Sequence, residues 1–472
     1  MLARLRHSVL IKVLGLLALT VLLCIPLARI EDLTRERGNS QREAAAELAS
    51  TYTGAQTLVG PFLVQPYLER WMEPQRDAQG RVVGQEVRSK EMAHLVFPDK
   101  LHIEGSLAPQ ERYRGIFRIP FFAMDASLEG AFSAFDAAAV PHSEKDSTLE
   151  FKPPYVALHL SDLRGLDGSP ALRLANETLR FQQRLPGVAE DAALAGGIHA
   201  PLAGSALAAW QARRPLGFTL KLGVVGQERL AMVPIGEETT AHLVSPWAHP
   251  SFGGRFLASE RSVTAQGFDA RWRVSSLVTT AREEVREALR GGRDGRPAGA
   301  GAAMQSFDVS LAQPLNVYAM STRAAKYGLL FIGLVLMAAF MFELFRRLRL
   351  HPVQYGLVGL SIAVFFLLLL ALSEKLAFWL AYACAASASV LLLGAYFSAV
   401  LRGRWRGASF AAYVALLYGA LYGLLASESN ALLLGALLVF GMLAVLMLAT
   451  RKVDWYALSM GEAAASGAGA QS

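Results

Sequence analysis

The sequence predicts a membrane protein with six transmembrane helices, one N-terminal and five C-terminal, and a large periplasmic mainly-β domain of antiparallel, sandwich-like type between them. Composition is the first reason, because 53% hydrophobic residues and a mean hydropathy of +0.32 are typical of integral membrane proteins. The second reason is that four segments contain no Asp, Glu, Lys or Arg, at residues 350–373, 376–401, 407–427 and 429–450. Each reaches the roughly 20 residues that a helix needs to cross a bilayer core.

The N-terminal segment predicts a further transmembrane span that is not removed by signal peptidase. Residues 1–30 begin with positive charges and continue as a charge-free run from 13 to 28. Pro26, Leu27 and Ala28 form a poor signal-peptidase site, so we expect an uncleaved signal anchor. Residues 31–56 are rich in Ala, Glu and Arg, which favour helix, and we expect a helical extension interrupted near Gly38 and Asn39.

The segment 57–326 is predicted to be rich in β-strands. Its short stretches alternate between apolar and polar residues, the period of half-buried strands, at 112–119, 148–151, 155–160, 172–181, 218–225, 230–234, 268–274 and 307–311. An Ala-, Gly- and Pro-rich stretch at 194–214 suggests a division into two subdomains. Residues 282–305 combine a short charged helix with many glycines, which is typical of a loop.

The C-terminal third predicts a five-helix bundle at 327–452 and a cytoplasmic tail at 453–472. Its expected spans are 327–345, 353–373, 376–401, 407–427 and 430–450. Eight basic residues follow alternate spans, at positions 346, 347, 349, 402, 404, 406, 451 and 452, whereas the opposite loops contain one, Lys375. By the positive-inside rule both termini are cytoplasmic and residues 31–326 are periplasmic, in an inner membrane.

The net charge of +7 does not indicate nucleic-acid binding. Residues 29–326 contain 34 basic and 34 acidic side chains, so the excess lies beside the apolar segments. Cys24 and Cys384 both fall inside apolar runs, which excludes a disulfide or a cysteine metal site in the soluble region.

The motifs of common enzyme classes are missing. The chain has no Walker A motif, no His-Glu-x-x-His and no Gly-x-Ser-x-Gly, so we predict no catalytic residue and no cofactor. His242 and His249 lie seven residues apart but lack a third ligand, and a metal site is not predicted. Trp247 and His249 are instead candidates on an ordered loop that packs on the domain or on the membrane surface.

Acidic residues at helix ends are the remaining candidates, because a charge inside a bilayer is costly to bury. Glu343 lies within the second span, and pairing with Arg346 or Arg347 is the simpler explanation of its presence. Glu374 with its neighbour Lys375, and Glu428, each follow a serine at the outer end of a span. They are either functional acids or simply the polar residues that a surface turn requires.

Small residues recur every four positions in two spans, at 377, 381, 385 and 389 and at 411, 415, 419 and 423. Such stripes let helices approach closely, which favours a compact bundle or a homo-oligomer seam.

The chain resembles the CreD family of inner membrane proteins over nearly its whole length. The segments that carry the resemblance are 58–61, 247–252, 323–328, 342–343, 347–361, 365–374, 429–435 and 454–459. The resemblance implies a protein of cell envelope integrity and stress adaptation, expressed within a two-component regulon. It brings no enzymatic activity, ligand or catalytic residue.

These observations predict a non-enzymatic protein whose periplasmic β domain binds an envelope component, either a periplasmic protein or cell-wall material, while its helices contact membrane lipids. The alternative is a transporter or lipid-handling protein that uses Glu343, Glu374 and Glu428. A membrane-embedded hydrolase or transferase is a weaker alternative, since no catalytic constellation supports it.

Overall fold

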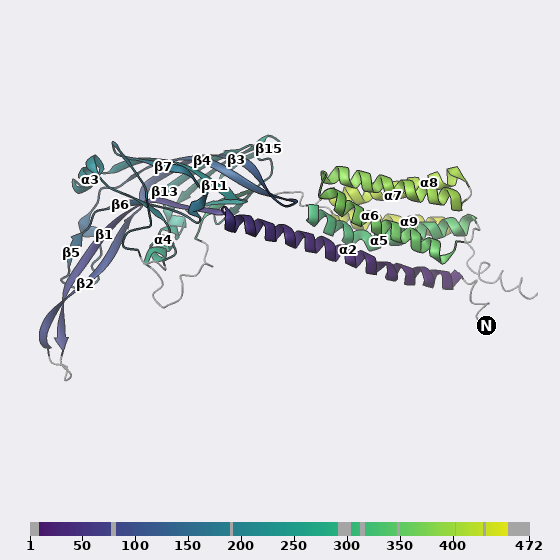
Figure 1. Cartoon of the computed structure of the whole chain (residues 1–472), viewed down its shortest axis with the longest axis horizontal. Coiled ribbons are helices and arrows are strands. Elements are labelled where there is room, and N and C mark those ends of the chain that lie inside the picture. Colours follow the sequence, from purple (N-terminus) through teal and green to yellow (C-terminus); the bar gives the residue numbers. More distant parts are fainter. Residues whose placement is uncertain are drawn as a thin grey trace, which may run out of the picture. The chain divides into compact units, whose positions relative to one another are not determined.

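The computed structural model describes residues 9–76, 82–188, 192–290, 304–311, 317–346, 350–401, 403–427 and 431–451. They form two compact units, a helical unit of Met1–Arg42 with Leu315–Ser472 and a β unit of Glu43–Pro314 (Figure 1). The β unit is therefore one body, and the predicted division near 194–214 is wrong. Residues 204–211 there form a short helix, α3 (Gly204–Gln211), which packs its buried Trp210 into the same core as both sheets.

The first helix, α2 (Val9–Thr51), contains both the predicted anchor and the predicted extension without a break. The interruption expected near Gly38 and Asn39 is wrong, because one glycine costs a helix only about 1 kcal/mol and the flanking Ala, Glu and Arg residues favour the helix. Pro26 also lies inside α2.

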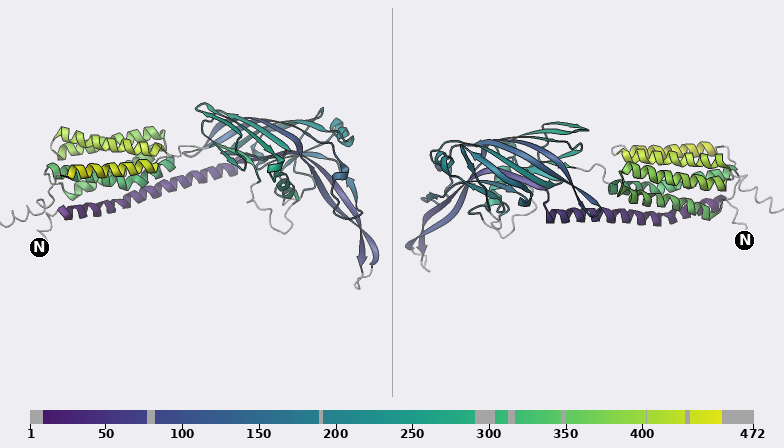
Figure 2. Two further views of the ribbon diagram at one scale, coloured as in Figure 1. Left: turned by 180° about the vertical axis from the view of Figure 1, so that it is seen from behind. Right: turned by 45° about the horizontal axis from the view of Figure 1, so that its top comes forward.

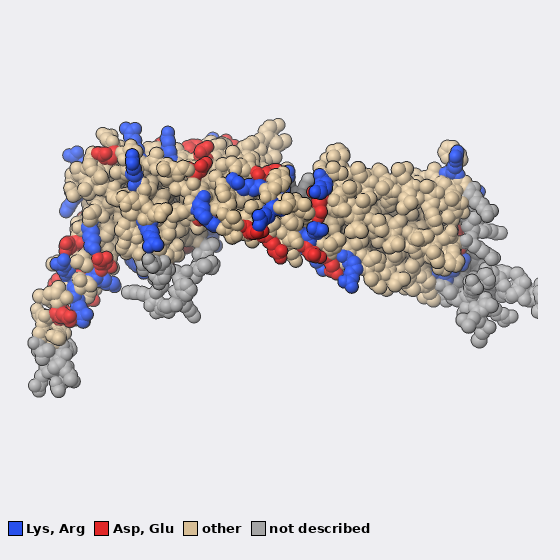
Figure 3. Space-filling model, in the orientation of Figure 1, with Lys and Arg blue, Asp and Glu red and all other residues tan. Residues whose placement is uncertain are grey.

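The other long helices are α5 (Val317–Arg346), α6 (Pro352–Ser373), α7 (Phe378–Val400), α8 (Arg404–Ala426) and α9 (Ala431–Thr450). Four of them lie within three residues of the predicted spans at each end, whereas α5 begins ten residues before the predicted start at 327. Among the described residues, five helices have the length and apolar composition to cross a membrane, and they include α2 and α5–α8. The apolar part of α9, Leu433–Val445, is shorter. On the face seen in Figure 3, charged side chains are sparse over the bundle of α5–α9, whereas charges of both signs are spread over the β unit.

Glycines let α2 pack closely on α5 and α6. A Cβ atom on Gly328 would lie 2.7 Å from a methyl carbon of Leu27, and one on Gly359 would overlap Leu23. Leu23 and Leu27 belong to the buried core of the helical unit, which combines residues of α2, α5, α6, α7 and α8. The close approach of backbones through small residues is the usual device of helix packing in membranes.

The β unit consists of two sheets. The nine-stranded sheet A contains β1 (Gln56–Arg76), β2 (Val82–Val96), β5 (Thr148–Phe151), β6 (Tyr155–Leu160), β9 (Gln182–Gln183), β10 (Ile198–Pro201), β12 (Arg229–Met232), β14 (Pro250–Gly254) and β17 (Phe307–Leu311). The eight-stranded sheet B contains β3 (Pro98–Arg114), β4 (Phe117–Phe132), β7 (Leu166–Leu174), β8 (Glu177–Leu179), β11 (Leu216–Gln227), β13 (Glu238–Ser245), β15 (Glu260–Thr264) and β16 (Gly267–Ser275).

One hydrophobic core joins the two sheets. It includes Leu58 and Phe62 of sheet A and Ile103 and Leu128 of sheet B, all at most 2% exposed. Most neighbouring strands are antiparallel as predicted, but β1 pairs with β12 and β3 pairs with β13 in parallel, so the sheets are mixed. The helix α4 (Ala281–Arg290) packs four apolar residues into this core, and residues 291–303 of the predicted loop lie outside the described part.

A long hairpin of β1 and β2 was missed by the sequence prediction. The two strands pair from Leu63 with Val96 to Arg76 with Val82, and they project from the sheets as an arm (Figure 2). Its outer half exposes residues on both faces, including the cross-strand pair Met72 and Val87, which are 61% and 62% exposed. Without one buried face the segment lacks the clean alternation by which a strand is recognised.

Candidate functional site

Glu343 is buried, as its position within a span predicts, and its described partners come from two other helices. Its side chain is 5% exposed and lies 2.9 Å from Lys12 Nζ of α2. The hydroxyl of Tyr355 on α6 donates a hydrogen bond of 2.5 Å to the second carboxylate oxygen. Glu343 therefore connects α2, α5 and α6. The partners expected for it are side chains outside the described part of the chain.

Glu374 ends α6 and lies 3.7 Å from the guanidinium of Arg37 on α2, measured from Oε1 to Nε. Its side chain is 16% exposed. Lys375 is exposed in the turn that follows, where its backbone N–H donates to the carbonyl of Leu372. Glu428 lies outside the described residues. Glu343 and Glu374 thus both pair with basic residues of the same helix, α2.

Trp247 lies in the loop between β13 and β14, as predicted. Its indole N–H donates to the carbonyl oxygen of His249 at 3.0 Å, and its ring packs partly on the core of the β unit. The side chain of His249 is exposed. These contacts describe an ordered loop.

The strongest candidate for a binding site is a groove on sheet B that sequence reasoning missed. It has a volume of about 590 Å³. The groove crosses five strands, β13, β3, β4, β11 and β7, and is lined by Glu104, Gly105, Ser106, Asp125, Ala126, Ser127, Ser169, Ala171, Lys221, Leu222, Gly223 and Val244. Residues that alternate with its polar lining, such as Ile103 and Leu128, face the core. The groove therefore lies on the outer face of the sheet.

Strand register brings the polar residues of the groove together. Ser106 pairs with Asp125, and Asp125 pairs with Gly223 on the next strand. One pair further along, Ser127 lies between Glu104 and Lys221. These residues are far apart in sequence, so they form no local motif that a sequence search could recognise.

A row of hydrogen-bonded side chains forms one edge of the groove. Glu104 accepts from His102 Nε2 at 3.0 Å through one oxygen and lies 2.9 Å from His242 Nδ1 through the other. The second nitrogen of His242, Nε2, lies 3.1 Å from Asp269 Oδ2, although without hydrogen-bond alignment. Both oxygens of Glu104 are thus engaged.

Asp125 and Lys221 differ from Glu104 because they are exposed charges without a partner. Within the described part of the chain, neither side chain has a hydrogen bond or an ion pair. The hydroxyls of Ser106, Ser127 and Ser169 likewise make no hydrogen bond to described residues. The groove therefore offers a free carboxylate, a free ammonium group and free hydroxyls.

The end of α2 packs on the same face of sheet B. Ala45, Leu48 and Tyr52 contact a small cluster that contains Phe121 and Val225. Because Phe121 lies four residues before Asp125 on β4, it points to the same face of the sheet as Asp125. The last turns of α2 and the groove therefore lie on the same face of sheet B.

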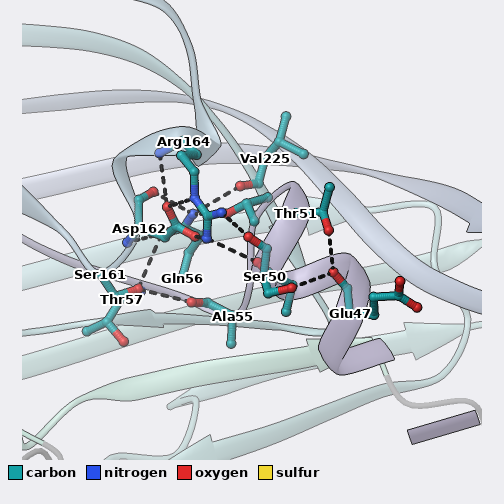
Figure 4. A network of polar contacts seen from close by, with 12 residues as sticks. Glu47, Ser50, Thr51, Ala55, Gln56, Thr57, Ser161, Asp162, Arg164 and Val225 are labelled. Atoms are coloured by element: carbon teal, nitrogen blue, oxygen red, sulfur yellow. Dashed lines mark hydrogen bonds and ion pairs between the residues drawn. The ribbon is translucent and has the colours of Figure 1, made fainter. Parts of the chain in front are cut away.

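A polar network fixes that helix end (Figure 4). Arg164 donates to the carbonyl oxygens of Ala49, at 3.1 Å, and Ser50, which satisfies acceptors that every helix C-terminus leaves open. It also pairs with Asp162 at 2.7 Å. Below it, the amide of the buried Gln56 donates to Thr53 Oγ1 at 2.8 Å, to the carbonyl of Asp162 at 2.9 Å and to that of Val225 at 3.2 Å.

Two buried ionisable groups of the β unit have strongly shifted pKa values. Burial would raise the pKa of Glu69, but hydrogen bonds from the hydroxyls of Ser143 and Ser147 and from two backbone N–H groups lower it to about 2. Burial lowers the pKa of His159 to about 4, against an ordinary value of 6.5. Both side chains are buried inside the β unit, and neither lines the groove.

We expect the β unit to lose stability in acid in two stages. The unfolded chain binds a proton at His159 below pH 6.5 and the folded chain does so below about 4, so stability falls as the pH drops between these values. The loss at this site is on the order of 3 kcal/mol. Glu69 then contributes stability above pH 4.5 that is lost as the pH falls toward 2.

Urea unfolding followed by circular dichroism at a series of pH values measures both stages. His159→Gln is expected to flatten the profile between pH 6.5 and 4 and to leave the lower stage in place. A variant profile that still falls by the same amount in the upper range would contradict the assignment.

Among the described residues, no group of three or more His, Cys, Asp or Glu side chains could hold a metal ion. His242 contacts carboxylates of β3 and β16 instead of forming a site with His249.

Comparison with known proteins gives a match over nearly the whole chain. The family model described as "Inner membrane protein CreD" matches residues 8–456. The inner membrane protein CreD of Escherichia coli strain K12 is 31% identical over 455 residues, which cover 96% of this chain and 95% of that protein. Among solved structures, an M1 zinc metallopeptidase from Deinococcus radiodurans aligns over 38% of each chain at 10% identity and a TM-score of 0.19, which does not indicate a shared fold.

Proposed function

The chain belongs to the CreD family of inner membrane proteins, and we propose that it is a non-enzymatic protein of envelope integrity and stress adaptation. In this proposal six helices anchor the chain, and the β unit lies in the periplasm and binds an envelope component. The shallow groove on sheet B is the observation that carries the proposal, since binding sites are concave and contain a few polar groups that orient a ligand.

The proposed orientation follows from the distribution of charge. Basic residues cluster after α5, α7 and α9, whereas the turn after α6 contains Glu374 with Lys375. This asymmetry supports a cytoplasmic position for both termini and a periplasmic position for the β unit.

Site-specific photo-crosslinking in intact cells tests the proposal. A photoreactive residue in place of Ser127, at the centre of the groove, is expected to form an adduct with a periplasmic protein or with cell-wall material. The same residue in place of Leu277, which is 92% exposed and does not line the groove, is the matched control. Equal adduct yields at the two positions, or none at Ser127, would refute binding through the groove.

A transporter or lipid-handling function is the second candidate, and the burial of Glu343 favours it. The contacts of this carboxylate with Lys12 and Tyr355 support a structural role instead, because both of its oxygens are bound by neighbouring helices.

A further inference from the structure

We propose that the groove on sheet B binds a short peptide with free ends, its amino group beside Asp125 and its carboxylate beside Lys221. This inference rests on the proposed function and names the chemical class of the ligand.

The floor of the groove is built from small residues. Ser106, Ser127, Ala171 and Gly223 occupy outward positions on four adjacent strands, where exposed sheet faces commonly carry long side chains. At Gly223 a Cβ atom would lie 2.9 Å from the carbonyl oxygen of Asp167, so the close approach of β7 requires glycine there. The small side chains leave space for a ligand against the sheet.

Opposite charges at the floor indicate a ligand that carries both signs. Glu104 is already engaged by His102 and His242, which leaves Asp125 as the free carboxylate. Asp125 and Lys221 are exposed, and the described residues supply no partner for either of them. A ligand with one cationic and one anionic group satisfies both, whereas an ion of one sign leaves the other charge unmatched.

The spacing of the two charges sets the length of the ligand. Asp125 pairs with Gly223, and Lys221 is two residues from Gly223 on β11, so the two charged residues are diagonal neighbours. Diagonal neighbours lie roughly 7–8 Å apart, with the Cβ atoms somewhat closer. An extended chain spans about 3.3–3.6 Å per residue, which matches a peptide of two to three residues. The hydroxyls of Ser106, Ser127 and Ser169 lie where they can bond its amide groups.

Titration calorimetry of the purified full chain in detergent, with tri-alanine as the probe, tests the inference. We expect measurable binding that weakens at least about tenfold when the peptide is N-acetylated or C-amidated, since each change removes one charge-assisted contact. Asp125→Asn and Lys221→Gln are expected to weaken binding of the unmodified peptide to a similar degree. The control variants are Glu129→Gln on β4 and Arg173→Gln on β7. Both positions belong to strands that the groove crosses but lie outside its lining, so they should leave binding unchanged.

Several outcomes would overturn the assignment. They are an absence of tri-alanine binding, equal binding of the blocked and free peptides, or binding of phosphoethanolamine without binding of the peptide. If photo-crosslinks still form at Ser127 while tri-alanine does not bind, the peptide class is wrong and the proposed function stands. Failure of both experiments removes both proposals.

Discussion

Replacement of Gly165 by alanine is expected to destabilise the β unit by about 3 kcal/mol, since overpacking and lost hydrogen bonds combine at this position. Gly165 ends a short 3-10 helix beneath the C-terminus of α2. A Cβ atom there would overlap the side-chain amide of Gln56 and the backbone carbonyl of Val225, and it would lie 2.9 Å from Thr53 Oγ1. The carbonyl belongs to a central strand and cannot yield, so Gln56 must move away from the acceptors that its side-chain amide contacts.

Gly196→Ala is the matched control, because a Cβ atom at Gly196 meets nothing within 4 Å. That change is expected to be neutral or to stabilise the protein by up to about 1 kcal/mol through the unfolded state. Urea unfolding of the full chain, followed by the β-sheet circular dichroism signal, compares the two variants. Equal stabilities would show that the network in Figure 4 does not fix the end of α2.

Removal of the Lys12 charge is expected to destabilise the helical unit more than removal of the Glu343 charge. Lys12→Met leaves a carboxylate that is 5% exposed, with the Tyr355 hydroxyl as its remaining partner among the described residues, and we expect a loss of about 2–4 kcal/mol. Glu343→Gln leaves a lysine side chain that is 42% exposed and can reach water, so the expected loss is about 1 kcal/mol.

The double variant Lys12→Met with Glu343→Gln should be more stable than Lys12→Met alone, because no buried charge remains uncompensated. Thermal unfolding in detergent measures the three variants. Equal losses in both single variants would contradict a buried ion pair. Loss of cellular function in Glu343→Gln at normal membrane levels and stability would instead favour the transport alternative.

Prediction from sequence succeeded where a local pattern decides the structure. Among the strands, 148–151, 155–160 and 307–311 match β5, β6 and β17 residue for residue, because each is bounded by a clear break. The arm of β1 and β2 was missed because its outer half has no buried face to produce alternation. The break expected near Gly38 was wrong because the flanking helix-forming residues outweigh one glycine.

The candidate site was predicted less well than the fold. Glu343 was identified from its place in an apolar run, but Lys12 lies 331 positions away and no local spacing connects the two. Trp247 and His249 proved to be neighbours in an ordered loop. Asp125 and Lys221 were not predicted as site residues, since single charged residues at exposed strand positions are common in proteins.

The sequence by itself determined the apolar helices, the family and the β-rich character of the middle segment, because hydropathy and periodicity act over a few neighbouring residues. The tertiary structure decided which of those elements meet. Strand register placed Asp125 and Lys221 on one surface, and helix packing brought Lys12 to Glu343. Register and packing depend on contacts between residues far apart in the chain, and a pattern read along one segment does not contain them.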